Sequence, residues 1–166
     1  MAKISWVAES VPEGMAIRQV YCIMLDLEGR VMLRVEKKPD RIKYSLAGGR
    51  PEVFDNGIEG TCRREFLEEV NTEIETPAYI GYQLVSEENG APAYAQVRMA
   101  ALIRKIGKKQ PDPDNGKTYD RLLATPEKTA VLLNWGEVGY SQIMAAKAAV
   151  YSRYGITGTD GTEEWI

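Results

Sequence analysis

The chain has 166 residues, of which 27% are charged, and its formal net charge is −3. This length is enough for one domain with a substantial core but not comfortably for two, so we expect a single domain over residues 1–166. The slightly negative charge gives no field that would attract a nucleic-acid polymer or an anionic membrane. The absence of histidine excludes histidine-based triads and histidine-ligated zinc.

The first two thirds of the chain are dominated by strand patterns. Residues 1–14 form an N-terminal edge segment, in which 4–7 predict a short edge strand. Apolar runs and alternating patterns, separated by turn residues, predict the further strands 16–27, 31–35, 44–46, 79–86 and 93–106.

The last third is predicted to be mostly helical. Residues 107–119 are too rich in Pro, Asp, Asn and Gly for regular structure, and 120–125 predict a strand or turn. A short helix is expected over 126–133 and a long one over 140–154, before a C-terminal tail at 155–166 that frays. This order of elements predicts a mixed α/β (α+β) sandwich.

The two cysteines, Cys22 and Cys62, lie in apolar patterns without metal-type spacing. We interpret them as reduced core residues, with a Cys22–Cys62 disulfide as the alternative. No apolar run approaches a membrane span, and the first residues lack the order of a signal peptide. The expectation is a cytoplasmic protein with no membrane partner.

Residues 56–70 predict a helix that carries the acidic residues of a candidate functional site. Glu65, Glu68 and Glu69 have i, i+3 and i+4 spacing, so three carboxylates share one helix face and repel one another. Three oxygen ligands on one rigid face suit a hard divalent cation such as Mg²⁺. An ordinary solvated helix with an Arg64–Glu68 ion pair is the alternative interpretation.

The opposite face of this helix is apolar, with side chains at i, i+4, i+8 and i+12 that predict packing on a core: Ile58, Cys62, Phe66 and Val70. Asn56, followed three residues later by Glu59, is typical of a capping box, so we expect the helix to begin at Asn56 or Gly57.

The stretch 48–71, GGRPEVFDNGIEGTCRREFLEEVN, resembles the Nudix hydrolase box. That box has glycine, five residues, glutamate, seven residues, then Arg-Glu, an apolar residue, any residue, Glu-Glu, any residue, glycine and an apolar residue. Counting forward from Gly49 places the first glutamate on Asp55, whereas counting back from Arg64 places it on Asn56, so one residue is inserted. Asn71 replaces the last glycine, and asparagine tolerates the left-handed conformation that a helix stop requires.

The resemblance implies a Nudix-like fold, with a mixed β-sheet between helices, and hydrolysis of a phosphoanhydride in a nucleoside diphosphate derivative: a nucleotide sugar, a dinucleotide or a nucleoside triphosphate. It implies Mg²⁺ or Mn²⁺ held by Glu68 and Glu69, with Glu65 as a further ligand or an orienting group. The backbone of Gly49 would approach the metal, and Arg64 would fix a carboxylate.

Further site residues are hypotheses on the same basis. Glu52, Asp55 and Arg50 would assist from the loop, and the aromatic rings of Tyr119 and Trp135, or of Tyr94, would stack on a base. The general base is left open among four acidic residues: Asp112, Asp114, Asp120 and Glu137.

Two other functions remain open: a Nudix-like nucleotide-binding or sensor domain without hydrolysis, and a structural domain whose acidic helix is fortuitous. Many relatives of the family are dimers, and the edge strand at 4–7 would suit a homodimer.

Overall fold

A computed structural model describes all 166 residues. Its strands are β1 (Lys3–Val7), β2 (Ile17–Leu25), β3 (Val31–Lys37), β4 (Ile42–Ser45), β5 (Gly48–Gly49), β6 (Thr72–Ile74), β7 (Ala78–Ser86), β8 (Tyr94–Ile106), β9 (Asp120–Ala124) and β10 (Glu164–Trp165). Its helices are α1 (Ile58–Val70), α2 (Pro126–Leu133) and α3 (Gly136–Tyr154), with a 3₁₀ turn, η1 (Val53–Asp55), before α1.

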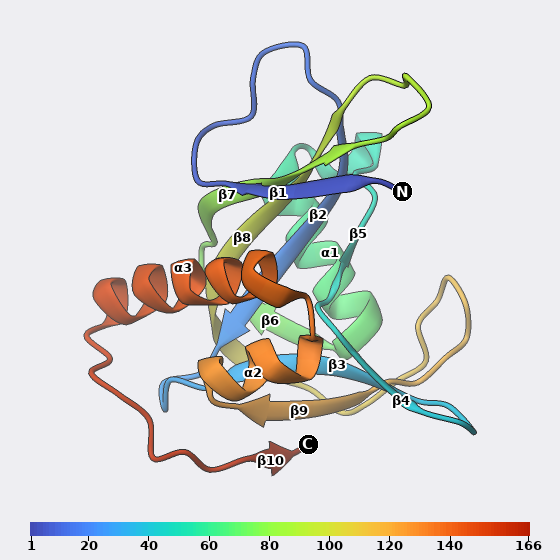
Figure 1. Cartoon of the computed structure of the whole chain (residues 1–166). Coiled ribbons are helices and arrows are strands. Elements are labelled where there is room, and N and C mark those ends of the chain that lie inside the picture. Colours follow the sequence, from blue (N-terminus) through green and yellow to red (C-terminus); the bar gives the residue numbers. More distant parts are fainter.

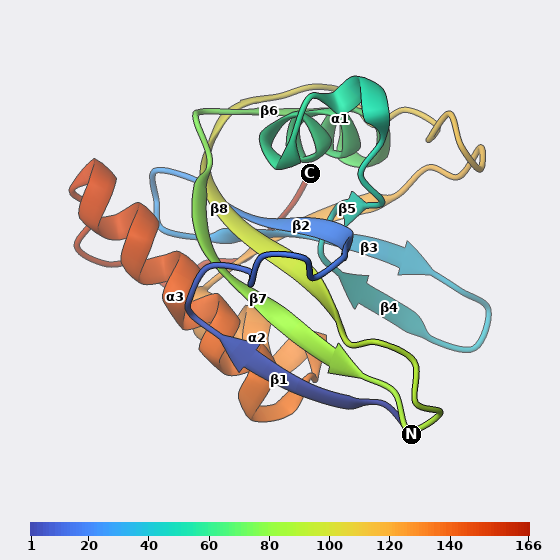
Figure 2. The same cartoon turned by 90° about the horizontal axis from the view of Figure 1, so that it is seen from above.

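The strands form one mixed sheet in the order β1-β7-β8-β2-β3-β9-β10, with β4 beside β3, β5 beside β2 and β6 beside β8. β2 and β8 run parallel, while neighbours such as β7 and β8 are antiparallel. α1 covers one face of the sheet, and α2 and α3 cover the other (Figures 1 and 2). The predicted α+β sandwich, with its mixed sheet between helices, is confirmed.

The sheet opens between two of its central strands. β2 and β3 share the ladder pair of Leu25 with Val31 and then separate, so that β5 pairs with β2 through Gly48 and Gly49 (Figure 1). Side chains near this opening can therefore reach from one face of the sheet to the other.

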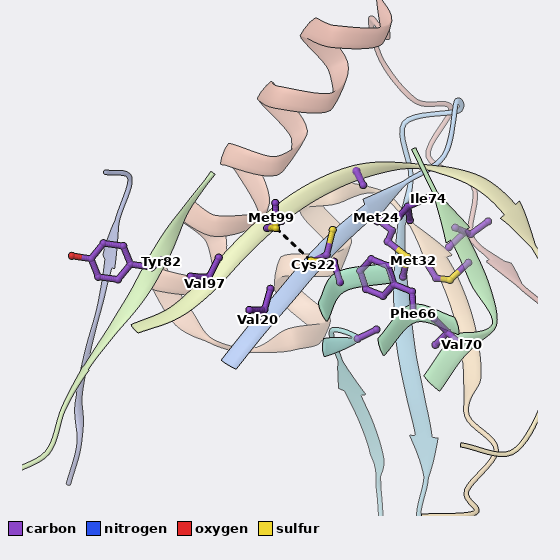
Figure 3. Close-up of a cluster of buried hydrophobic side chains, with 14 of the residues drawn as sticks. Val20, Cys22, Met24, Met32, Phe66, Val70, Ile74, Tyr82, Val97 and Met99 are labelled. Carbon is purple, nitrogen blue, oxygen red and sulfur yellow. Dashed lines mark hydrogen bonds between the residues drawn. The ribbon is translucent and has the colours of Figure 1, made fainter. Parts of the chain in front are cut away.

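The core has two layers, one on each side of the sheet. Under α1, Phe66 and Val70 pack against Val20, Cys22 and other apolar side chains of the strands (Figure 3), which confirms the predicted apolar face of this helix. A second cluster lies under α2 and α3. Both cysteines are buried and free, so the interpretation as reduced core residues holds over the disulfide.

Three details of the predicted elements are wrong. Asn56 does not cap α1: it adopts a left-handed conformation that ends η1, and Gly57 is the N-cap, without a side-chain bond. The long helix begins at Gly136, because the turn after α2 is only two residues long. The tail does not simply fray, since β10 pairs with β9. None of the helices combines the length and apolar character that a membrane span requires.

Candidate active site

The loop that enters α1 is fastened to the helix through Gly49. A methyl group at Gly49 would collide with the carboxylate of Glu65, so the absence of a side chain lets this carboxylate lie against the backbone of β5.

At the other end of the helix, Asn71 has a φ of 45° and its backbone N–H donates to the carbonyl oxygen of Phe66. The helix stop expected of Asn71 is confirmed.

Arg64 connects the helix with this loop. Its Nε and Nη2 donate to the two carboxylate oxygens of Asp55 at 2.6 and 3.0 Å, a forked pair of charge-assisted hydrogen bonds. Nη1 donates to Glu65 Oε1 at 3.0 Å and to Glu68 Oε2 at 3.2 Å, and Nη2 also donates to the carbonyl of Arg50 at 3.0 Å. One guanidinium therefore positions three carboxylates and the loop backbone.

Asp55 has a structural position in this network. Its carboxylate also accepts hydrogen bonds from the Glu52 backbone N–H and the Thr61 hydroxyl, both at 2.8 Å. The hydrogen bonds from Arg64 hold the pKa of Asp55 well below its usual range, and Asp55 in turn raises the pKa of Arg64. Both oxygens of Asp55 are thus engaged inside the protein, and Glu52 lies in the loop beside it.

Glu69, at the end of the acidic face, is paired with an arginine that sequence reasoning did not identify. Arg34 Nη1 donates to Glu69 Oε2 at 2.6 Å, its Nε donates to the Ser45 hydroxyl at 3.0 Å, and its guanidinium stacks 4.5 Å from the ring centre of Tyr119. Burial raises the pKa of Glu69 to about 8; the Arg34 charge opposes this, and the Glu65 charge adds to it.

The acidic face of α1 offers carboxylate oxygens to a divalent cation. Glu65 and Glu69 are buried and close enough for each to act on the pKa of the other, while Glu68 is more exposed and turns to Arg64. No three acidic or cysteine side chains are already assembled in metal-binding geometry. Burial raises the pKa of both Glu65 and Glu69, because a buried carboxylate is costly to ionise. A bound cation that prefers oxygen ligands would lower that cost for both side chains. The carboxylate oxygens are donors of the kind that a hard divalent cation such as Mg²⁺ or Mn²⁺ prefers.

The remaining candidates for the general base are dispersed. Asp112 is buried, accepts a hydrogen bond from the Asp114 backbone, and its charge acts on Glu69. Asp120 is paired with Lys37 and Lys109 at the surface.

A cavity of ≈ 600 Å³ lies on the face of the sheet opposite α1, at the opening between β2 and β3, and its wall includes Trp135 at the start of α3. Arg34 lines this cavity as well as binding Glu69, so it connects the cavity with the acidic face. Arg98 on β8 also lines it. Each of these two arginines stands between apolar neighbours in its strand, Leu33 and Val35 or Val97 and Met99, and that pattern could have revealed both. Tyr94, by contrast, stacks with Arg18.

Comparison with solved structures gives the class of fold. The Bacillus subtilis pyrophosphohydrolase BsRppH is similar over 93% of each chain, with 18% identity and a TM-score of 0.62. The E. coli ORF135 protein (18% identity, TM-score 0.58) covers 87% of this chain and 98% of its own. A Nudix hydrolase from Nitrosomonas europaea (15% identity, TM-score 0.58) covers 87% and 93%.

The chain therefore has the fold of the Nudix hydrolases. No protein-family model and no curated protein matches the sequence itself.

Proposed function

We propose that this protein is a metal-dependent hydrolase that cleaves a phosphoanhydride bond in a nucleoside diphosphate derivative. The observation that carries the proposal is the buried pair Glu65 and Glu69, which lies beside the close backbone of Gly49 and reaches the large cavity through Arg34. The fold shared with pyrophosphohydrolases supports it.

The carboxylates and arginines around α1 have different roles in this proposal. Glu65 and Glu69, with Glu68 as a third ligand, would hold Mg²⁺ or Mn²⁺, which would neutralise phosphate charge and activate water when bound. Arg64 holds Glu65 and Glu68 in place through its link to Asp55. Arg34 pairs with Glu69 and also lines the cavity, where its guanidinium would contact phosphate oxygens with its forked donors.

The test is a screen of nucleoside triphosphates, dinucleotides and nucleotide sugars for hydrolysis with Mg²⁺, with Mn²⁺ and with EDTA. We expect turnover of at least one compound that stops in EDTA. In the same assay Glu69→Gln should lose this turnover, and Glu59→Gln is its matched control, because Glu59 lies on the same helix and pairs only with Arg63 at the surface. Turnover unaffected by EDTA would refute the metal-dependent mechanism.

A second candidate is a domain that binds a nucleotide without hydrolysing it. The observation that favours it is the position of Asp55, which stands at the first glutamate of the box when the count runs forward from Gly49. Both of its oxygens are occupied by Arg64. Specific binding of a nucleotide without turnover in any metal would select this candidate.

A further inference from the structure

Arg98 is a buried cation without an anionic partner. The residue is 2% exposed, its Nε donates to Gln142 Oε1 at 2.7 Å, and its Nη2 is 3.4 Å from Gln83 Oε1. Every polar partner is a neutral amide or a backbone carbonyl, and no carboxylate lies within ion-pair distance. Buried charges are normally paired because their desolvation is costly, so the missing anion requires an explanation.

Aromatic rings do not supply the missing charge. The guanidinium lies 4.8 Å from the ring centre of Tyr21 and 5.9 Å from that of Trp135, contacts that stabilise a cation only partly. Burial lowers the pKa of Arg98 to about 10, a direction that an adjacent carboxylate would have opposed. No anion in the folded chain compensates this charge.

The cavity beside Arg98 also lacks acidic groups. None of its 12 lining residues is acidic, although the whole chain carries more acidic than basic residues. Two further cations, Arg34 and Lys43, stand in its wall, together with the amide side chains of Gln19 and Gln96. The cavity thus offers positive charge and hydrogen-bond donors, with aromatic surface from Trp135.

We propose that this cavity binds an oxyanionic group of the substrate, a carboxylate or a phosphate distant from the scissile bond, which pairs with Arg98. Arg34 lies both in the cavity wall and against Glu69, so one ligand can place its phosphoanhydride at α1 and its second anionic group at Arg98. The inference rests on the proposed function for the phosphoanhydride part of the ligand. In it, Arg98 determines specificity by selecting ligands that carry the second anionic group.

Binding of matched compounds tests this proposal and separates the two sources of the oxyanion. UDP-glucuronate differs from UDP-glucose by a carboxylate, and NADP differs from NAD by a phosphate. Calorimetric titration in EDTA measures binding without hydrolysis. We expect the anionic member of at least one pair to bind about tenfold more tightly or better, and the pair that discriminates identifies the anion.

Two variants show whether Arg98 carries that preference. Arg98→Met should remove it, leaving the two members equal. Gln96→Glu should also remove the preference while keeping Arg98. Residues 96 and 98 lie on one face of β8, so the new carboxylate would form an ion pair with the guanidinium in place of the ligand. Asn89→Asp makes the same amide-to-carboxylate change in the distant β7–β8 turn and should keep the full preference.

The outcomes distinguish this inference from the proposed function. Equal binding of both members in both pairs overturns the inference, as does a preference that survives in both Arg98→Met and Gln96→Glu. Hydrolysis measured separately with Mg²⁺ decides the other question. A preference for the anionic member without any turnover supports the cavity assignment and contradicts the hydrolase, whereas turnover without the preference does the opposite.

Discussion

Arg64 and Arg98 occupy opposite faces of the same sheet and have opposite electrostatic surroundings. Arg64 lies among the carboxylates of Asp55, Glu65 and Glu68, and their charges raise its pKa. Arg98 has only amides, carbonyls and rings around it, and burial lowers its pKa to about 10. One cation completes a network inside the chain, and the other is left without an anion.

The comparison indicates how the two regions share a ligand. Around α1, carboxylates remain in excess over arginines, so this region gains from a further cation. In the cavity, Arg98 has no anionic partner, so that region gains from an anionic ligand. A substrate that binds a divalent cation at one end and carries negative charge at the other would satisfy both regions.

The largest expected effect is the loss of the network around Arg64. Arg64→Met leaves Asp55 buried without its cation, and breaking a buried pair from one side costs about 3 to 5 kcal/mol of unfolding free energy. Urea unfolding at pH 7 measures this loss. Arg63→Met, on the adjacent exposed side chain, is the control and should cost less than about 1 kcal/mol. Equal losses in the two variants would contradict the structural role given to Arg64.

Glu69→Gln tests the acidic face as a metal site. Removing one charge while keeping the shape should lower Mg²⁺-dependent turnover on the order of a hundredfold or more. In the metal-free variant two changes oppose each other, because the ion pair with Arg34 is weakened and the repulsion from Glu65 is removed, so its stability should stay close to that of the parent chain. Rates and thermal melts with and without Mg²⁺ measure both effects. Wild-type turnover by this variant on a verified substrate would show that the metal assignment is wrong.

The part of this comparison around α1 could be predicted from the sequence, and the part around the cavity could not. Glu65, Glu68 and Glu69 are close in sequence, so helical spacing alone places them on one face. The apolar side chains from Ile58 to Val70 likewise encode the burial of the helix. Local periodicity carries this information without knowledge of the rest of the chain.

The cavity depends on contacts between distant segments. Arg98 meets Gln142 across 44 positions, and Arg34 meets Glu69 across 35, so no local pattern contains either pair. Asn56 does not cap α1 for a related reason: the Glu52–Asp55 capping box starts η1, and Asn56 ends that turn in a left-handed conformation. Such details follow from how the loop packs on Arg64.

Asp55→Asn should cost about 2 kcal/mol at pH 7, because hydrogen bonds to a charged carboxylate are replaced by bonds to a neutral amide. Since the folded-state pKa of Asp55 is depressed, its ionised form stabilises the protein above the unfolded pKa, which is about 4 for Asp, and this contribution is lost as pH falls towards the folded value. The difference between the two proteins should therefore shrink from pH 7 to pH 3. Urea unfolding across this range measures it, and a difference that is constant with pH would argue against an ionised Asp55.

Arg98→Met should change stability far less than Arg64→Met, and it completes the comparison of the two arginines. Gln142 Oε1 loses its donor, which costs about 1 to 3 kcal/mol, but the desolvated cation is removed as well, and Gln142 Nε2 keeps its 2.9 Å bond to Gln83. Because these effects oppose each other, the unfolding free energy should change by less than about 1 kcal/mol in either direction. Urea unfolding of both methionine variants in one buffer measures the contrast directly. A loss at Arg98 as large as that at Arg64 would mean that the cation is already compensated within the fold, and the case for an anionic ligand in the cavity would fail.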